Sequence, residues 1–192
     1  MKSFNARGFT LIESLVAITI LVIGVLGPLT IAVRGISDGL YARNNLVAAF
    51  LAQEGVEVIR NLRDTALIAA LAQGLGEADV FAGMTGNFGI DASVPALTSG
   101  CPGSVTARNV SPCVLGFSPG AGRYVPVTTQ NDIVGPRFLR RATLVVEDNN
   151  TENPADDRLV ARVEVQWFNG VTSKNLIMPL ELLRQGPGGN PQ

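Results

Sequence analysis

Residues Phe9 to Val33 read FTLIESLVAITILVIGVLGPLTIAV, an apolar run of twenty-five residues whose single charged side chain is Glu13. A helix of this length extends about 37 Å, enough to cross the hydrocarbon layer of a bilayer with some tilt. The basic segment MKSFNARG, residues 1–8, precedes the run, and Arg34 ends it. Because basic flanks stay in the cytoplasm, the rest of the chain is expected outside. We therefore expect a single-pass membrane protein.

Three interpretations of this N-terminus compete, and the first two leave something unexplained. A cleaved secretory signal peptide has an apolar core of about 7–15 residues and a small-residue cleavage site. This run is longer, and residues 24–28, GVLGP, make a poor site of that kind. An uncleaved signal anchor explains the length and the basic flank but gives Glu13 no role. A carboxylate within a membrane helix costs about 2–3 kcal/mol, and less near the interface.

The third interpretation explains the glutamate. Residues 7–15, RGFTLIESL, resemble the N-terminal signature of type IV pilin precursors, which is a basic leader ending in glycine, then Phe-Thr-Leu-Ile-Glu, then an apolar helix. The resemblance implies that a prepilin peptidase/N-methyltransferase cleaves between Gly8 and Phe9 and methylates the new amine of Phe9. It implies residence in the inner (cytoplasmic) membrane, then at the cell surface in a pilus. The implied partners are other pilin subunits, an inner-membrane assembly platform and, before assembly, the lipid bilayer.

The resemblance also implies a role for Glu13 in assembly. Cleavage leaves a cation at Phe9, four positions before Glu13, and in a bundle of such helices the carboxylate of one subunit can meet the amine of a neighbour. Two opposite charges buried together are tolerated where one alone is not, and a buried polar pair fixes register. The alternative is that the Glu13 side chain merely reaches back to the membrane interface.

Gly24, Gly27 and Pro28 interrupt the apolar run. Proline inside a helix removes a backbone hydrogen bond and clashes with the carbonyl four residues earlier, and glycine lowers helix propensity. We expect a kink or a locally extended stretch at residues 24–28. The pilin resemblance implies that this weak point melts when a filament forms, and a static kink in a membrane helix is the alternative.

Residues 35–64 predict an amphipathic continuation of the helix. At 100° per residue, six apolar side chains fall within an arc of about 80° and need a sheet to pack against. These are Ile36, Leu40, Val47, Leu51, Val58 and Leu62. The polar side carries Gln53, Glu57, Arg60, Arg63 and Asp64. Residues 51–64, LAQEGVEVIRNLRD, also resemble minor pilins of the pilus-modification (PilV-like) group, where Ala-Gln-Glu-Gly-x-Glu precedes Arg-x-x-Arg-Asp.

The rest of the chain predicts an extracytoplasmic α+β head. Residues 74–126 are rich in Gly, Pro, Ser and Thr and indicate loops with short strands. Three strand patterns follow, at residues 138–147, 158–168 and 171–183. Asn169-Gly170 predicts a hairpin turn between the last two, and Pro179 is typical of an edge strand. A long helix packed on this antiparallel sheet gives the α+β roll that the pilin resemblance also implies.

Cys101 and Cys113 are the two cysteines of the chain, with eleven residues between them. Two cysteines alone cannot bind zinc, and an oxidising compartment outside the membrane favours a disulfide over two unrelated thiols. A bridge would close a loop worth about 3 kcal/mol in the chain-entropy model. In many pilins the disulfide closes a loop nearer the C-terminus, but here the predicted strands come after the cysteines.

The sequence lacks the residues on which most catalytic sites are built. It has no histidine and no nucleotide-binding loop, serine-hydrolase or zinc-protease motif, so we expect no enzyme, no cofactor and no metal. Four acidic residues are more typical of a solvated loop than of a calcium site: Asp148, Glu152, Asp156 and Asp157. A net charge of −1 and a small basic spot indicate no nucleic-acid partner. That spot consists of Arg137, Arg140 and Arg141, of which the adjacent pair points to opposite faces of a strand.

The sequence therefore predicts a minor pilin of a type IV pilus that helps to start or modify the filament. A minor pseudopilin of a type II secretion system would have the same N-terminus. A rival of another class is a single-pass anchored extracellular binding domain that never polymerises. The expected parts are a leader (1–8), a transmembrane and assembly helix (9–34), an amphipathic helix (35–64), the head (65–184) and a disordered tail (185–192).

Overall fold

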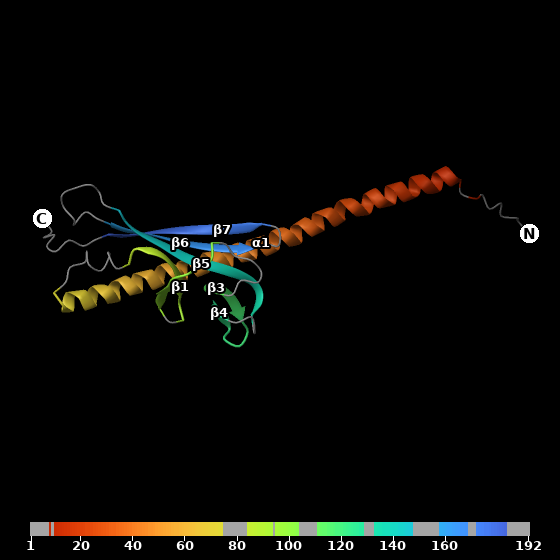
Figure 1. The fold of residues 1–192 in the computed structure, drawn as a ribbon. Helices are drawn as coiled ribbons and strands as arrows, with labels where there is room; N and C mark the ends of the chain where they lie inside the picture. Colours follow the sequence, from red (N-terminus) through yellow and green to blue (C-terminus); the bar gives the residue numbers. More distant parts are fainter. Residues whose placement is uncertain are drawn as a thin grey trace, which may run out of the picture. The chain divides into compact units, whose positions relative to one another are not determined.

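The computed structural model describes Gly8 and residues 10–74, 84–93, 95–103, 111–128, 133–147, 158–168 and 172–183. The chain divides into two compact units, residues 1–43 and residues 44–192. The described residues form one helix and seven strands (Figure 1). They are α1 (Leu11–Ala72), β1 (Gly86–Asp91), β2 (Ala96–Thr98), β3 (Ser111–Ser118), β4 (Arg123–Val127), β5 (Val134–Glu147), β6 (Arg158–Phe168) and β7 (Ser173–Leu183).

The first unit contains the apolar half of α1, which stays α-helical through residues 24–28. The locally extended stretch expected there is absent from this structure of the single chain. Pro28 removes one backbone donor, but the surrounding helix keeps its other bonds. The Thr30 hydroxyl also donates to the carbonyl of Leu26 at 2.9 Å, one turn earlier. A kink at residues 24–28, and their melting during assembly, stay predictions.

The second half of α1 packs on the sheet through a face of small and branched side chains. The buried residues between 44 and 60 are Ala48, Leu51, Ala52, Gly55, Val56, Val58 and Ile59. The predicted stripe was therefore placed wrongly at its start, because Ile36 and Leu40 are 66% and 55% exposed. The buried face includes alanine and glycine, and a search for large apolar residues does not detect them. The small residues matter because they let the strands approach the helix backbone closely.

Gly55 marks the closest approach. A Cβ atom added there would lie 3.0 Å from Cγ1 of Val163 and 3.1 Å from Cδ1 of Ile90. Leu62 and Val47 pack at the margin of the same core and are partly buried, while Gln53 and Glu57 are exposed as predicted. The helix continues to Ala72, beyond the predicted end of the amphipathic helix at residue 64.

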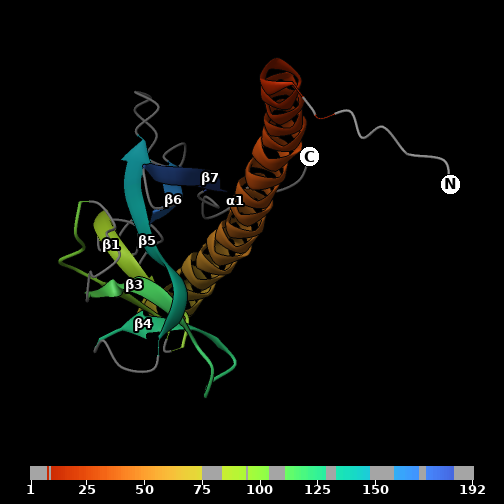
Figure 2. The same cartoon turned by 90° about the vertical axis from the view of Figure 1, so that its right-hand side faces the viewer.

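All strand pairs are antiparallel, and β5 lies at their centre. Along one edge β5 pairs with β6, from Phe138 opposite Trp167 to Glu147 opposite Arg158, and β7 pairs with β6 beyond it. Along the other edge β5 pairs first with β3 and then with β1, which carry β4 and β2. The sheet curls, as the bend of β5 in Figure 2 shows. One long helix packed on a curled antiparallel sheet confirms the predicted α+β class.

The later strands follow the sequence pattern closely. Strand β6 has the predicted bounds, and its residues Ala161, Val163, Val165 and Trp167 are buried on the side of α1. Strand β5 begins four residues before the predicted start, and β7 begins two residues after. The predicted turn at Asn169-Gly170 lies outside the described residues, as does the tail 185–192. Pro179 lies in β7, which pairs with β6 alone among the described strands and so forms an edge.

The short strands expected among residues 74–126 are present as β1 to β4, so the statement that the strands come after the cysteines was wrong. Strands β1 and β2 precede Cys101, and Cys113 lies within β3. The sequence of β1, GNFGID, has two glycines and little of the alternation that marks a strand. Its place comes from pairing with β5, opposite residues 141–144. Strand formation here is a consequence of tertiary contacts, which local propensity does not report.

Arg140 of β5 lies where the helix meets the sheet, and it is 1% exposed. Its Nη1 donates to the carbonyl of Leu51 at 3.1 Å and to the carboxylate of Glu54 at 2.5 Å. Its Nε and Nη2 donate to the carbonyl of Ile90 at 3.3 and 2.9 Å. Burial lowers the pKa of Arg140, and the carboxylates of Glu54 and Asp91 act against that shift. The guanidinium therefore stays charged and joins α1, β1 and β5.

This position corrects the interpretation of Arg140 as part of a surface basic spot. Arg140 and Arg141 point to opposite faces of the sheet, as predicted. Arg140 lies on the face that α1 covers. The sequence pattern gave no sign of this, because no rule of spacing relates residue 140 to residue 54. Arg141, on the other face, is only partly buried.

We predict that Arg140→Ala lowers the free energy of unfolding by about 3 kcal/mol, because it leaves buried carbonyls without a donor and opens a cavity. Glu54→Gln should cost only about 1 kcal/mol, since Glu54 is half exposed and glutamine keeps a hydrogen bond. Urea unfolding of the full chain in detergent, followed by the fluorescence of the single buried tryptophan, Trp167, measures both. Glu57→Gln, in an exposed pair with Arg60, is the control. Equal effects of all three substitutions would contradict the assignment.

Candidate processing and assembly site

Thr10 caps the N-terminus of α1. Its Oγ1 accepts a hydrogen bond from the backbone N–H of Glu13 at 3.3 Å, and its carbonyl accepts one from the N–H of Ser14 at 3.1 Å. Threonine at the cap with glutamate three positions later is the spacing of a capping box. Gly8 lies just before this cap, and Phe9 falls outside the described residues. The predicted cleavage after Gly8 would leave the cap intact in the mature chain.

Glu13 stands in the first turn of the helix and is exposed. A carboxylate at this end interacts favourably with the partial positive charge of the helix N-terminus. The side chain therefore has a local structural use that sequence reasoning missed, although the Thr-x-x-Glu spacing would have revealed it. Within the described part of the chain, no basic side chain is paired with the carboxylate.

The apolar half of α1 has no cover in the single chain. Every large apolar side chain from Leu11 to Leu40 is exposed, by 43% to 84%. By length and composition this helix can cross a membrane, and the most apolar stretch has no buried part. The Thr19 hydroxyl donates to the carbonyl of Leu15 at 2.8 Å. This hydrogen bond satisfies the hydroxyl, for which lipid tails offer no acceptor. A helix that is apolar on all sides needs lipid or other helices around it.

The N-terminus of the chain matches a known sequence family. The prokaryotic N-terminal methylation motif matches residues 3–27, which include Gly8, Phe9, Glu13 and Gly24. No curated protein and no solved structure matches the chain significantly. The motif implies processing by a prepilin peptidase and assembly with other pilin subunits. Together with the uncovered helix and the α+β head, it supports a type IV pilin-like or pseudopilin precursor with a structural role, and the helix is compatible with a single-pass anchor.

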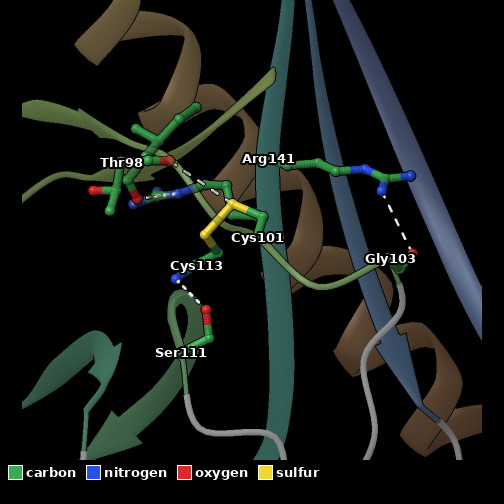
Figure 3. Close-up of a disulfide and its surroundings, with 8 residues drawn as sticks. Thr98, Cys101, Gly103, Ser111, Cys113 and Arg141 are labelled. Atoms are coloured by element: carbon green, nitrogen blue, oxygen red, sulfur yellow. Dashed lines mark hydrogen bonds between the residues drawn. A yellow bond between two sulfur atoms is a disulfide. The ribbon is translucent and has the colours of Figure 1, made fainter. Parts of the chain in front are cut away.

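In the head, Cys101 and Cys113 form a disulfide (Figure 3). Cys113 is fully buried in β3, and its N–H donates to the Ser111 hydroxyl at 3.2 Å. Cys101 belongs to the segment after β2, so the bridge fixes that segment against β3. A Cβ atom on Gly89 would lie 2.4 Å from Sγ of Cys113 and 2.9 Å from Sγ of Cys101. Only glycine at position 89 leaves room for the disulfide over β1.

We predict that Gly89→Ala displaces the disulfide or prevents its formation, because the added methyl group would occupy the position of the sulfur atoms. The matched control is Gly103→Ala, since a Cβ atom at Gly103 has no neighbour within 4 Å. Thiol alkylation followed by intact mass measurement counts free cysteines in each variant. A fully oxidised Gly89→Ala variant with unchanged stability towards urea would contradict the prediction.

The outer face of β5 and β6, away from α1, carries a polar network around Glu164. Arg141 donates to Glu164 through Nε at 2.8 Å and lies within 2.6 Å of it through Nη2. Gln166 and Asn175 donate to the other carboxylate oxygen at 2.9 and 3.2 Å. Burial by itself raises the pKa of Glu164, but these hydrogen bonds and the charge of Arg141 outweigh it, and the pKa is lowered.

A lowered pKa in the folded state means that Glu164 contributes stability above its unfolded pKa of about 4.3, and that this stability is lost as the pH falls through the lower folded value. We therefore expect Glu164→Gln to be less stable at pH 7 and to lose less stability on acidification. Urea unfolding of the full chain from pH 7 to pH 3, compared with Glu57→Gln, measures this. An unchanged acid slope in Glu164→Gln would show that the network does not act through the charge.

Two other sequence predictions concern residues 51–64 of α1 and metal binding by the head. The resemblance of residues 51–64 to pilus-modification proteins stays a prediction. Within that segment Glu54 pairs with Arg140, and Gly55 lies against Val163. Among the residues that the structure describes, no group of three or more potential ligands could hold a metal ion. The four acidic residues considered for calcium, Asp148, Glu152, Asp156 and Asp157, lie outside the described residues.

Proposed function

We propose that this protein is a minor pilin of a type IV pilus, cleaved after Gly8, methylated at the Phe9 amine and assembled through α1. It resides in the inner membrane with the head outside until the assembly platform incorporates it. The observation that carries the proposal is Glu13, a carboxylate at the start of an uncovered apolar helix and within the matched methylation motif.

The physics of the uncovered helix supports assembly with like helices. Lipid covers the apolar side chains before assembly, and other helices can cover them afterwards without exposing them to water. Lipid offers no partner for Glu13, whereas the methylated amine of a neighbour's Phe9 does. Bringing the two charges together stabilises the packed state and sets the axial stagger of the helices.

A minor role, as opposed to that of a main pilin, is supported by the resemblance of residues 51–64 to the pilus-modification group. A minor pseudopilin of a type II secretion system fits the same motif and helix. Deletion of the chain separates these two, because loss of surface pili with normal secretion supports the pilus, and the opposite result supports the secretion system.

The first experiment is intact mass and N-terminal sequencing of the protein from its native membrane, with a peptidase-deficient strain as control. A chain that starts at Phe9 with one added methyl group is expected, and the control strain should retain Met1. If the chain still starts at Met1 in cells with active peptidase, the protein is an uncleaved anchored domain and the proposal fails.

We further predict that Glu13→Gln is processed normally but enters sheared pili at least about tenfold less, because the neighbour's amine loses its counter-charge. Glutamine has nearly the size of glutamate and also occurs at this position of a capping box, so the change removes the charge and leaves the cap by Thr10 in place. Ser14→Ala is the matched control on the adjacent residue. Immunoblots of the sheared and membrane fractions give the ratio. Unchanged incorporation of Glu13→Gln would restrict Glu13 to its local role in the cap.

A further inference from the structure

A polar pocket lies on the face of the sheet that α1 does not cover. It has a volume of about 460 Å³ and is lined by Asn87, Phe88, Gly100, Cys101, Arg141 and Thr143. Asn87 is paired with Thr143, and Gly89 with Arg141, so the side chains of Asn87, Thr143 and Arg141 share the outer face. Gly100 and the disulfide-bonded Cys101 form the wall of the pocket, and Figure 3 shows Arg141 donating to the carbonyl of Gly103 in the same segment.

The side chains of this pocket are held in place before any ligand arrives. Arg141 is fixed by Glu164 and also donates to the carbonyl of Gly103 at 3.4 Å. The Thr143 hydroxyl donates to Oδ1 of Asn87 at 2.7 Å. The disulfide fixes Cys101, and with it the wall, relative to β3. Such preorganisation lowers the entropic cost of binding, and the volume lies in the range of small-molecule sites.

The chemistry of the lining selects the ligand. The Arg141 guanidinium and the amide nitrogen of Asn87 offer hydrogen-bond donors, and the Thr143 hydroxyl, which donates to Asn87, offers an acceptor. None of the described residues that line the pocket is acidic. Glu164 already pairs with Arg141 and would repel a dianionic phosphate more strongly than a ligand with a single carboxylate. Cys101 is held in the disulfide and cannot act as a nucleophile. The pocket therefore suits binding and not catalysis.

We propose that this pocket binds a hexuronic acid, either as a free sugar or as a residue of a polysaccharide. The carboxylate lies against Arg141, and the ring hydroxyls exchange hydrogen bonds with Asn87 and Thr143. The proposal concerns the head alone and does not depend on cleavage, methylation or polymerisation of the chain. Binding can therefore be measured on the unassembled protein.

The test is saturation-transfer NMR on the full chain in detergent micelles, with galacturonate as the probe and galactose as the neutral control. Galacturonate should receive saturation, and galactose should bind at least about tenfold more weakly because it lacks the carboxylate. Trigalacturonate distinguishes the source of the ligand. Tighter binding of the trimer indicates a polysaccharide, and weaker binding indicates the free sugar. Absence of transfer to galacturonate and trigalacturonate overturns the proposal.

Variants locate the binding site. Asn87→Ala alters an exposed side chain and should weaken galacturonate binding about tenfold. Arg141→Gln combined with Glu164→Gln removes both charges together and should abolish the preference for galacturonate over galactose. Asn61→Ala, an exposed amide on α1, is the matched control and should bind normally. The fluorescence of Trp167 confirms folding of each variant. Unchanged galacturonate binding in Asn87→Ala and in the double variant overturns the proposal.

Discussion

The guanidinium of Arg140 connects α1, β1 and β5, although Arg140 and its partner Leu51 are 89 positions apart in the chain. It reaches the carbonyl of Leu51 and the carboxylate of Glu54 on the helix, and the carbonyl of Ile90 on β1. A buried charge is costly unless every donor finds an acceptor, so this arrangement admits one register of helix against sheet. The small side chains of α1 around Gly55 allow the helix and the sheet to approach closely, and Arg140 fixes the position of the contact.

The two faces of β5 have different roles, one in the core and one in the polar pocket. The inner face meets α1 and is apolar apart from Arg140, while the outer face carries Arg141, Thr143 and the disulfide segment. The disulfide occupies the space next to Gly89. The short strand β1, which has a low strand propensity, therefore packs directly against the disulfide. One strand with alternating side chains thus organises both the core and the polar pocket outside it.

The N-terminal half of α1 stands in contrast to this closed head. Its apolar side chains are all exposed in the single chain, and its stability in water would be poor without lipid or neighbouring helices. Residues 44–192 form a compact unit of their own, so the packing around Arg140 does not involve the apolar side chains of residues 11–40. This separation suits the proposed minor pilin, whose helix would pass from lipid to a filament.

The sequence by itself determined the apolar helix, the N-terminal methylation motif at residues 3–27, the α+β class and the strand β6, because each is encoded by residues close together in the chain. Tertiary structure alone decided where the buried face of α1 begins, the part that alanine and glycine play in it, the place of β1 and β2, and the burial of Arg140. These depend on which segments meet: alanine and glycine count as a packing face only when strands lie against them, and an arginine is buried only when distant carbonyls and a carboxylate receive its donors.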